Sequence, residues 1–278
     1  MTRCAGIRAR SACIRRTVKD LAELLGRTLV VVAHPDDEVI GCGALLQRMR
    51  EPIVVFCTDG APRPARWWQK YGSRAAYSHL RREEAREALS RAGVGNFEFL
   101  AGGNSDSFVD QELFTRLPEV VEALQSAAER YRPAAMLTHA YEGGHPDHDA
   151  CCFVTSTVAR RMGLPAWEMP LYRRDPDGKS VTQQFVQRSG QELEVHVSGD
   201  EVERKRRMVQ AYPSQGDIIS AFDATVERVR PMYDYDFSQP PHPGKLNYEM
   251  WQWHMTGREV ADAFAEYSKS IAKVATSR

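Results

Sequence analysis

The sequence predicts an α/β fold, a mostly parallel sheet flanked by helices, with a C-terminal part that contains a β-hairpin and helices. Short apolar segments without periodicity, typical of strands buried on both faces, alternate with helical segments through the first 165 residues. Such alternation is typical of βαβ units, whose right-handed crossovers produce parallel sheets. The 278 residues, 42% of them hydrophobic, also suffice to form the core of one domain.

The strands of this core are predicted by their apolar and β-branched composition. They cover residues 28–34, 53–60, 97–100 and 134–140. The helices around them have helical composition and cover residues 18–26, 41–50, 77–92, 110–131 and 145–162. Pro118 is expected to interrupt or restart the fourth helix, because proline lacks a backbone N–H. Residues 61–73, rich in Pro, Arg and Trp, predict a long functional loop.

After about residue 165 the alternation stops. The later elements are, in order, an antiparallel hairpin around Gly190 (183–189 with 193–198), a helix (201–212), a loop (230–248) and a C-terminal helix (258–270). No repeat or low-complexity linker divides the chain. We therefore expect a single domain, residues 1–278, with a core at about 28–165 and a substrate-specific part at about 166–278.

Charge and composition argue against several classes of protein. The 37 Lys and Arg balance 37 Asp and Glu, so no global field attracts nucleic acid or an anionic membrane. No apolar stretch reaches the ~18 residues of a membrane span. The six cysteines form no CxxC pair, which opposes a four-cysteine zinc site and favours a reduced, cytoplasmic protein. For the Arg-rich N-terminus we expect a solvated helix or tail, with a transit peptide as the alternative.

The residues that carry chemistry lie in two motifs at the ends of predicted strands. His34-Pro35-Asp36-Asp37-Glu38 closes the first strand, and His145-Pro146-Asp147-His148 follows the strand 134–140 after a short loop. Ligands of open parallel sheets bind at the carboxyl ends of the strands, so both motifs can reach one crevice. Imidazoles and carboxylates without thiolates are the ligand set of a catalytic divalent metal. Taken singly, the motifs also fit a helix N-terminus and an exposed turn; together they predict a metal site.

These motifs carry a family resemblance. VVVAHPDDEVIGCGALL followed by HPDHD resembles the PIG-L/LmbE family of zinc-dependent N-deacetylases over residues 28–165. KRRMVQAYPSQ, at 205–215, is similar to the family's late Lys…Tyr-x-Ser-Gln segment. The resemblance implies a Rossmann-like fold and a bound Zn²⁺, or another divalent metal such as Fe²⁺. It implies a hydrolase that removes an N-acetyl or other N-acyl group from an amino sugar or sugar-containing metabolite.

By position, the resemblance also assigns roles. His34, Asp37 and His148 match the family's metal ligands, Asp36 matches its general base, and His145 matches the histidine that assists the tetrahedral transition state. A metal of this kind lowers the pKa of a bound water towards ~7. A nearby carboxylate can then take the water's proton and pass it to the leaving amine.

Two positions leave alternatives open. Some relatives place a tyrosine two residues before the first histidine of HPDH, where this chain has Gly143, with Tyr141 and Glu142 nearest. Asp147 either orients a histidine as a supporting carboxylate or serves the N-terminus of its helix.

Four residues are candidates for substrate binding. Arg81 is similar to an arginine of the family that faces the substrate, or it pairs with Glu84 on a helix surface. Asp106 is similar to an acid that binds sugar hydroxyls, or it is an ordinary turn residue. Trp67 and Trp68 stack on a sugar or aglycone, or pack onto the domain.

The segment between Asp59 and Glu83 contains no acid. Its cations are Arg63, Arg66, Lys70, Arg74, Arg81 and Arg82. We expect them to form a basic, aromatic rim suited to a small anionic sugar conjugate, with a solvated surface as the alternative.

Two other functions fit part of the pattern. Two histidines and one carboxylate also make the iron site of a non-haem oxygenase, which the parallel alternation opposes. A catalytically silent sugar-binding module is opposed by the presence of Asp36 together with all three candidate ligands.

Overall fold

The computed structural model describes residues 21–101 and 108–276, with side chains up to residue 273. Seven strands form one sheet in the order β3–β2–β1–β4–β5–β9–β8. Their bounds are β1 (Arg27–Val32), β2 (Glu51–Phe56), β3 (Asn96–Phe99), β4 (Ala135–His139), β5 (Ala166–Met169), β8 (Leu193–His196) and β9 (Val226–Pro231). The first five are parallel, and β9 and β8 add an antiparallel edge. The predicted fold class is confirmed.

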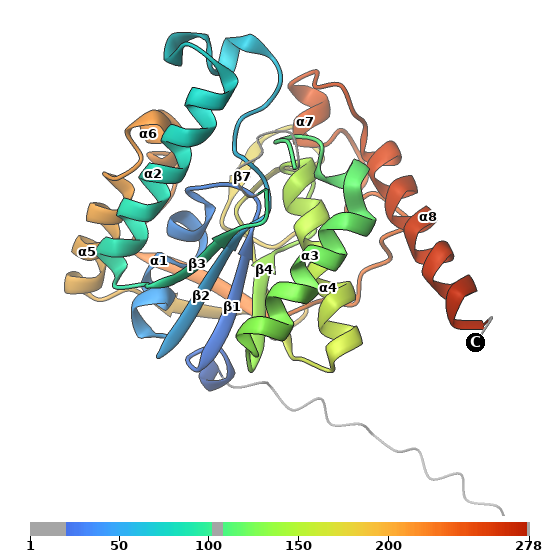
Figure 1. Ribbon diagram of the computed structural model, residues 1–278, viewed down its shortest axis with the longest axis horizontal. Coiled ribbons are helices and arrows are strands. Elements are labelled where there is room, and N and C mark those ends of the chain that lie inside the picture. Colours follow the sequence, from blue (N-terminus) through green and yellow to red (C-terminus); the bar gives the residue numbers. More distant parts are fainter. Residues whose placement is uncertain (1–20, 102–107, 277–278) are drawn as a thin grey trace, which may run out of the picture.

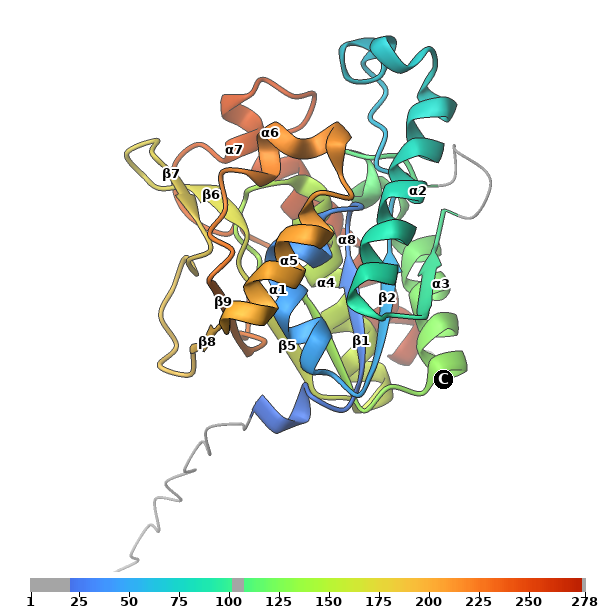
Figure 2. The ribbon, with the colours of Figure 1, turned by 90° about the vertical axis from the view of Figure 1, so that its left-hand side faces the viewer.

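Helices cover both faces of this sheet (Figures 1 and 2). One face carries α1 (Asp37–Arg48), α2 (Arg74–Ala92) and α5 (Gly199–Val209), and the other carries α3 (Leu117–Tyr131), α4 (Pro146–Met162) and α8 (Gly257–Thr276). The short helices are η1 (Leu21–Glu23), η2 (Ala65–Trp67), η3 (Gln69–Tyr71), η4 (Leu113–Arg116), η5 (Pro213–Gln215), α6 (Gly216–Ile219) and α7 (Asn247–Met250). Among the described residues, no helix combines the length and apolarity needed to cross a bilayer.

The central strand β1 is buried on both faces, as its composition predicts. Leu29 and Val31 belong to the core cluster under α3 and α4, whereas Val30 and Val32 belong to the cluster under α1 and α2. Alternate side chains of a strand point to opposite faces, so an unbroken apolar run is what a two-sided layer requires.

The C-terminal part departs from the prediction. The expected hairpin of 183–189 with 193–198 is wrong: residues 183–189 form no strand, and β8 pairs instead with β9. A different hairpin is present, between β6 (Tyr172–Arg174) and β7 (Ser180–Thr182). Through β5, β9 and β8, this part of the chain extends the same sheet.

The remaining helix predictions differ mainly at their ends. Helix α3 begins at Leu117 with Pro118 in its first turn, so the predicted restart is confirmed. Of the predicted helix at 18–26, the described residues contain only the turn η1, and residues 18–20 lie outside them. Helix α2 begins three residues earlier than expected, where Ser73 caps it by accepting the N–H of Ala76.

Candidate active site

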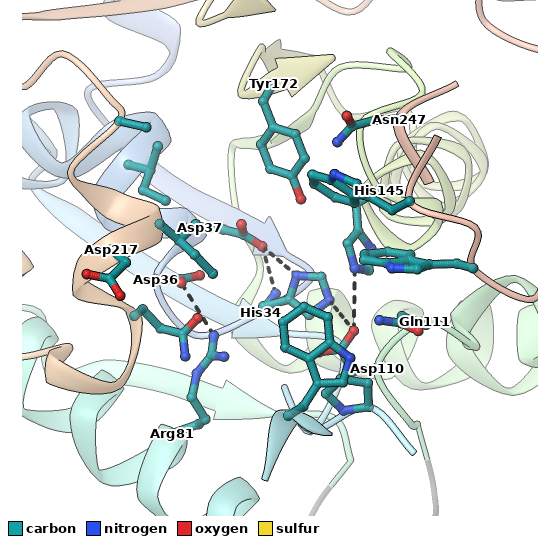
Figure 3. A pocket seen from close by; sticks show the side chains of 18 of the residues that line it. His34, Asp36, Asp37, Arg81, Asp110, Gln111, His145, Tyr172, Asp217 and Asn247 are labelled. Carbon is teal, nitrogen blue, oxygen red and sulfur yellow. Dashed lines mark hydrogen bonds and ion pairs between the residues drawn. The ribbon is translucent and has the colours of Figure 1, made fainter. Parts of the chain in front are cut away.

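The two motifs meet where β1 and β4 end. These strands are parallel neighbours, so their carboxyl ends lie at the same edge of the sheet. His34 follows β1, and His145 caps α4 by accepting the N–H of Asp147 at Nδ1. Both lie in the wall of a cavity of about 740 Å³, together with Asp36 and Asp37 (Figure 3). The predicted juxtaposition of the motifs is therefore present.

Two buried histidines flank the carboxylate of Asp37. Nδ1 of His34 lies 3.3 Å from Oδ2 of Asp37, and Nε2 of His148 lies 3.3 Å from Oδ1. Neither ring nitrogen of His148 has a hydrogen-bond partner among the described residues, although the side chain is buried. Burial lowers the pKa of His148 well below its ordinary value, which keeps the imidazole neutral and its lone pair available. Among the described residues, His148 and Asp37 form with His139 one group whose ligand atoms are close enough to hold a metal ion, and His148 and His34 form another with His145.

The acids around His34 also favour a bound cation. Burial acts to lower the pKa of His34, but the carboxylates of Asp110, Asp147 and Asp37 outweigh it and raise the pKa well above the ordinary value. The acids therefore stabilise a positive charge at this position, which a divalent cation would supply.

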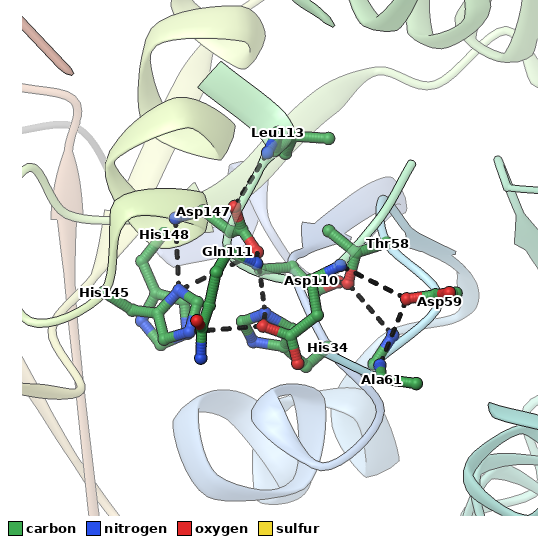
Figure 4. A network of polar contacts seen from close by, with 12 residues as sticks. His34, Thr58, Asp59, Ala61, Asp110, Gln111, Leu113, His145, Asp147 and His148 are labelled. Carbon is green, nitrogen blue, oxygen red and sulfur yellow. Dashed lines mark hydrogen bonds and ion pairs between the residues drawn. The ribbon is translucent and has the colours of Figure 1, made fainter. Parts of the chain in front are cut away.

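Asp147 holds His34 in place. Its Oδ2 lies 3.1 Å from Nε2 of His34 and accepts the N–H of Gln111, while Oδ1 accepts the N–H of Leu113 (Figure 4). With Nε2 engaged in this way, Nδ1 of His34 is directed towards Asp37. Of the two roles left open for Asp147, the structure favours the supporting carboxylate that orients a ligand.

A further histidine, which the sequence analysis missed, supports the candidate metal ligands. His139, the last residue of β4, stacks on His148 with 4.0 Å between ring centroids. Its Nε2 accepts the N–H of Ala33 at 3.0 Å, so the lone pair nearest Asp37 is already used. We therefore count His139 as support for His148 rather than as a ligand.

Asp36 occupies a strained backbone conformation beside the donors. Its φ of 113° is unusual for a residue with a side chain, and its N–H donates to Glu38 at 3.0 Å. Glu38, for which the sequence suggested no role, in turn accepts the hydroxyl of Tyr212 at 2.5 Å. Burial raises the pKa of Asp36 to about 7, opposed by the nearby Arg81. A carboxyl group with such a pKa can both accept and return a proton near neutrality.

Arg81 is buried against Asp36 rather than paired on the helix surface. Its guanidinium lies 3.5 Å from Oδ2 of Asp36 and donates to the carbonyls of Pro35 and Gly60. Glu84, the alternative partner, instead accepts the N–H and hydroxyl of Ser214. Arg81 lines the cavity, as expected of a residue that faces the substrate.

The late segment at 205–215 supports the site from behind. Tyr212 reaches Glu38, Ser214 reaches Glu84, and the amide of Gln215 donates to the hydroxyl of Tyr77. These contacts explain why the segment resembles the family: its side chains hold α1 and α2 in place beside the cavity.

The cavity also contains an acid that the sequence analysis did not select. Oδ1 of Asp110 lies 3.3 Å from Nε2 of His34 and 3.4 Å from Nε2 of His145. Burial acts to raise the pKa of Asp110, but the two imidazoles outweigh it and lower the pKa. Its signal was an acid directly after the apolar pair Phe108-Val109. The predicted acid, Asp106, lies outside the described residues.

The aromatic and basic loop after β2 only partly faces the cavity. Trp67 lines it, but Trp68 does not: its indole donates to the carbonyl of Arg63. Of the six cations, only Arg66 and Arg81 belong to the cavity lining. Arg63 binds Glu112 and Arg74 binds Asp59, so acids elsewhere in the chain hold them. The predicted basic rim is therefore wrong for most of its members.

The structure gives a steric reason why Gly143 stands where some relatives have a tyrosine. A Cβ atom at Gly143, whose φ is +72°, would lie 2.7 Å from Leu246. Tyr141 points away and donates to the carbonyl of Gln239, while Glu142 accepts the N–H groups of Leu171 and Tyr172. The anchored strand β6 instead brings the side chain of Tyr172 into the cavity, with its hydroxyl towards the site (Figure 3).

Comparison with known proteins agrees with this geometry. Residues 29–159 match the family described as PIG-L, GlcNAc-PI de-N-acetylase. This segment, just under half of the chain, is similar to that family. It contains all the candidate metal ligands and the candidate base, and the predicted resemblance is confirmed.

Individual relatives match in the same region. A 1D-myo-inositol 2-acetamido-2-deoxy-alpha-D-glucopyranoside deacetylase of Nocardia farcinica is 30% identical over 53% of this chain and 56% of its own. A 2'-N-acetylparomamine deacetylase of Streptomyces fradiae is 32% identical over 44% and 48%. The chain therefore spans about half the length of the curated relatives it matches.

A solved structure extends the likeness in fold beyond residues 29–159. A deacetylase–teicoplanin complex from the biosynthesis pathway of teicoplanin superposes with a TM-score of 0.58 at 18% identity. The match covers 74% of this chain and 97% of that one. At this identity the comparison shows the shared fold.

Proposed function

We propose that this protein is a zinc-dependent N-deacetylase that hydrolyses the amide of an N-acetylated amino sugar or sugar conjugate. The observation that carries the proposal is the convergence of His34, Asp37 and His148 beside the high-pKa carboxyl of Asp36. The named activities of the relatives, all deacetylations of amino-sugar derivatives, support the same substrate class.

The metal would be held by Nδ1 of His34, a carboxylate oxygen of Asp37 and Nε2 of His148. Two imidazoles and one carboxylate leave a position open for water, which is typical of catalytic zinc. When bound, such an ion supplies Lewis-acid activation of water and of the amide carbonyl. Fe²⁺ favours the same donor types and is the second candidate.

Asp36 moves the proton in this proposal. Its carboxylate accepts a proton from the attacking water and returns it to the nitrogen of the leaving amine. Arg81 holds the carboxylate, and the Glu38–Tyr212 pair holds the backbone that positions it. The strained φ of Asp36 thus has a use, because it directs the side chain into the cavity beside the metal ligands.

Two donors are available to a developing oxyanion. Nδ1 of His145 accepts the N–H of Asp147, so a proton on this ring sits on Nε2, which also faces Oδ1 of Asp110 at 3.4 Å. The hydroxyl of Tyr172 is directed towards the site (Figure 3). We assign it the second donor position, supplied by β6 instead of the loop before His145.

The alternatives have less support. A parallel sheet opposes the non-haem oxygenase, which is expected on an antiparallel barrel-like scaffold. A silent binding module does not account for a strained, high-pKa carboxyl beside three metal donors.

The test measures release of primary amine and acetate from a panel of N-acetylated amino sugars by metal-free protein, before and after addition of Zn²⁺ or Fe²⁺. We expect hydrolysis that requires the metal and falls about 10²–10⁴-fold in Asp36→Asn. Asp234→Asn, at an exposed carboxylate outside the cavity, is the matched control. Undiminished release by Asp36→Asn would exclude this residue as the base, and oxygen consumption with 2-oxoglutarate would favour the oxygenase.

A further inference from the structure

Large hydrophobic side chains are exposed at only a few places among the described residues. Ile218, Met250 and Trp251 are 48%, 45% and 44% exposed. Ile218 and Trp251 line the active-site cavity, whereas Met250 does not. Both lining residues lie at the ends of short helices, α6 and α7, outside the two core clusters. Apolar side chains held at a cavity mouth without a core to join are typical of a binding surface.

These side chains continue a row of aromatic rings that begins at the catalytic centre. The ring of Trp253 lies 4.9 Å from that of His145 and 5.1 Å from that of Trp251. Trp251 lies 6.2 Å from Tyr172, which lies 6.1 Å from Phe222. We call Trp253, Trp251, Tyr172, Phe222 and Ile218 the apolar wall. All five line the cavity, so the apolar wall runs from His145 to the exposed residues at the cavity mouth.

The charged groups of the cavity are distributed differently. Asp36, Asp37 and Asp110 gather at the metal donors, where the catalytic chemistry accounts for them. Among the described residues that line the cavity, the only charged groups beyond these acids, the histidines and the buried Arg81 are one cation, Arg66, and one further acid, Asp217. Their charges offset each other, so the cavity has no strong electrostatic preference for an anionic substituent.

We propose that the substrate carries an apolar group, an alkyl chain or aromatic ring, that lies along the apolar wall while its amide occupies the catalytic centre. The inference rests on the proposed deacetylase function and adds to it the class of substituent. Aromatic faces gain from covering an apolar group, and Trp251 has nearly half of its surface free to do so. Such a group can belong either to the acyl chain or to the aglycone of the sugar.

The experiment compares kcat/KM for three amides: N-acetylglucosamine, its octyl glycoside, and N-octanoylglucosamine. The two octyl compounds separate an apolar aglycone from an apolar acyl chain. We expect at least one to exceed N-acetylglucosamine by about tenfold or more in the metal-loaded protein, as burial of apolar surface predicts. Trp251→Ala should reduce that ratio towards one. Met250→Ala, equally exposed and adjacent but outside the cavity lining, should preserve it.

Ile218→Asn provides a second variant on a different element, should Trp251→Ala not fold. Equal kcat/KM values for all three amides, or an unchanged preference in both wall variants, would overturn the proposal. Failure of every amide to be hydrolysed would instead contradict the deacetylase function. In that case calorimetric titration with octyl glucosaminide and with glucosamine decides the inference. Tighter binding of the octyl compound, lost in Trp251→Ala, supports the wall, and equal binding refutes it.

Discussion

Lys205 and Glu227 form a buried ion pair that holds an irregular helix under the active site. The ammonium of Lys205, 2% exposed, lies 2.7 Å from Oε1 of Glu227 and donates to the carbonyl of Ile40 at 3.1 Å. Helix α1 leaves helical geometry at Cys42 (φ −147°, ψ 25°), in the first turns after Asp37, the proposed metal ligand. The pair thus supports the helix that carries part of the site.

Glu227 also binds the backbone of α1 just after the irregular residue Cys42. Its carboxylate accepts the backbone N–H groups of Ala44 and Leu45 at 2.6 and 2.9 Å, next to the irregular residue. Lys205→Met keeps an unbranched side chain, one atom shorter, and leaves the charge of Glu227 buried without its cation. Removal of one partner from a buried pair costs about 3–5 kcal/mol. The two remaining N–H donors favour the lower half of that range, out of a typical total of about 5–15 kcal/mol.

Urea unfolding followed by circular dichroism and tryptophan fluorescence measures this loss. Lys269→Met, at an exposed position of α8, is the helical control and should change the free energy of unfolding by less than about 0.5 kcal/mol. A loss below about 1 kcal/mol in Lys205→Met, with an unchanged urea dependence, would refute the argument that this pair secures α1.

Three further changes test the site and its surroundings. Tyr172→Phe should lower kcat by about 10–100-fold with little change in KM, since it removes one of the two proposed oxyanion donors; an unchanged kcat contradicts that role. Asp147→Asn should weaken metal binding by about 10–100-fold in a chelator competition, because it loosens His34; unaltered affinity refutes the orienting role. The hydrogen bond from Arg48 lowers the pKa of Glu201 to about 2, so this group stabilises the fold above its ordinary pKa of 4.5 and the benefit is lost as pH falls through 2. Glu201→Gln should therefore lower stability at neutral pH and flatten its dependence between pH 4.5 and 2; parallel pH curves would contradict this.

The error in strand pairing has a physical cause. Strand β9 carries Glu227 and Arg230, both about 1% exposed, which a local pattern reads as solvated residues. They are buried because Lys205 and Glu168, distant in sequence, neutralise them. The local sequence does not reveal these ion pairs, so it does not predict β9 as a strand. β8 is then paired with the nearest apolar segment instead of with β9.

By itself, the sequence determined the parallel core and the place where its two motifs meet. The apolar runs of β1, β2 and β4 and the two motifs at the ends of β1 and β4 depend on local composition and on the rule that parallel strands end at one edge. The tertiary structure alone decided which side chains complete the cavity. Tyr172 enters because Glu142 anchors β6, and most of the loop cations turn away because Glu112 and Asp59 hold Arg63 and Arg74. These outcomes depend on contacts between segments far apart in the chain, which no local pattern encodes.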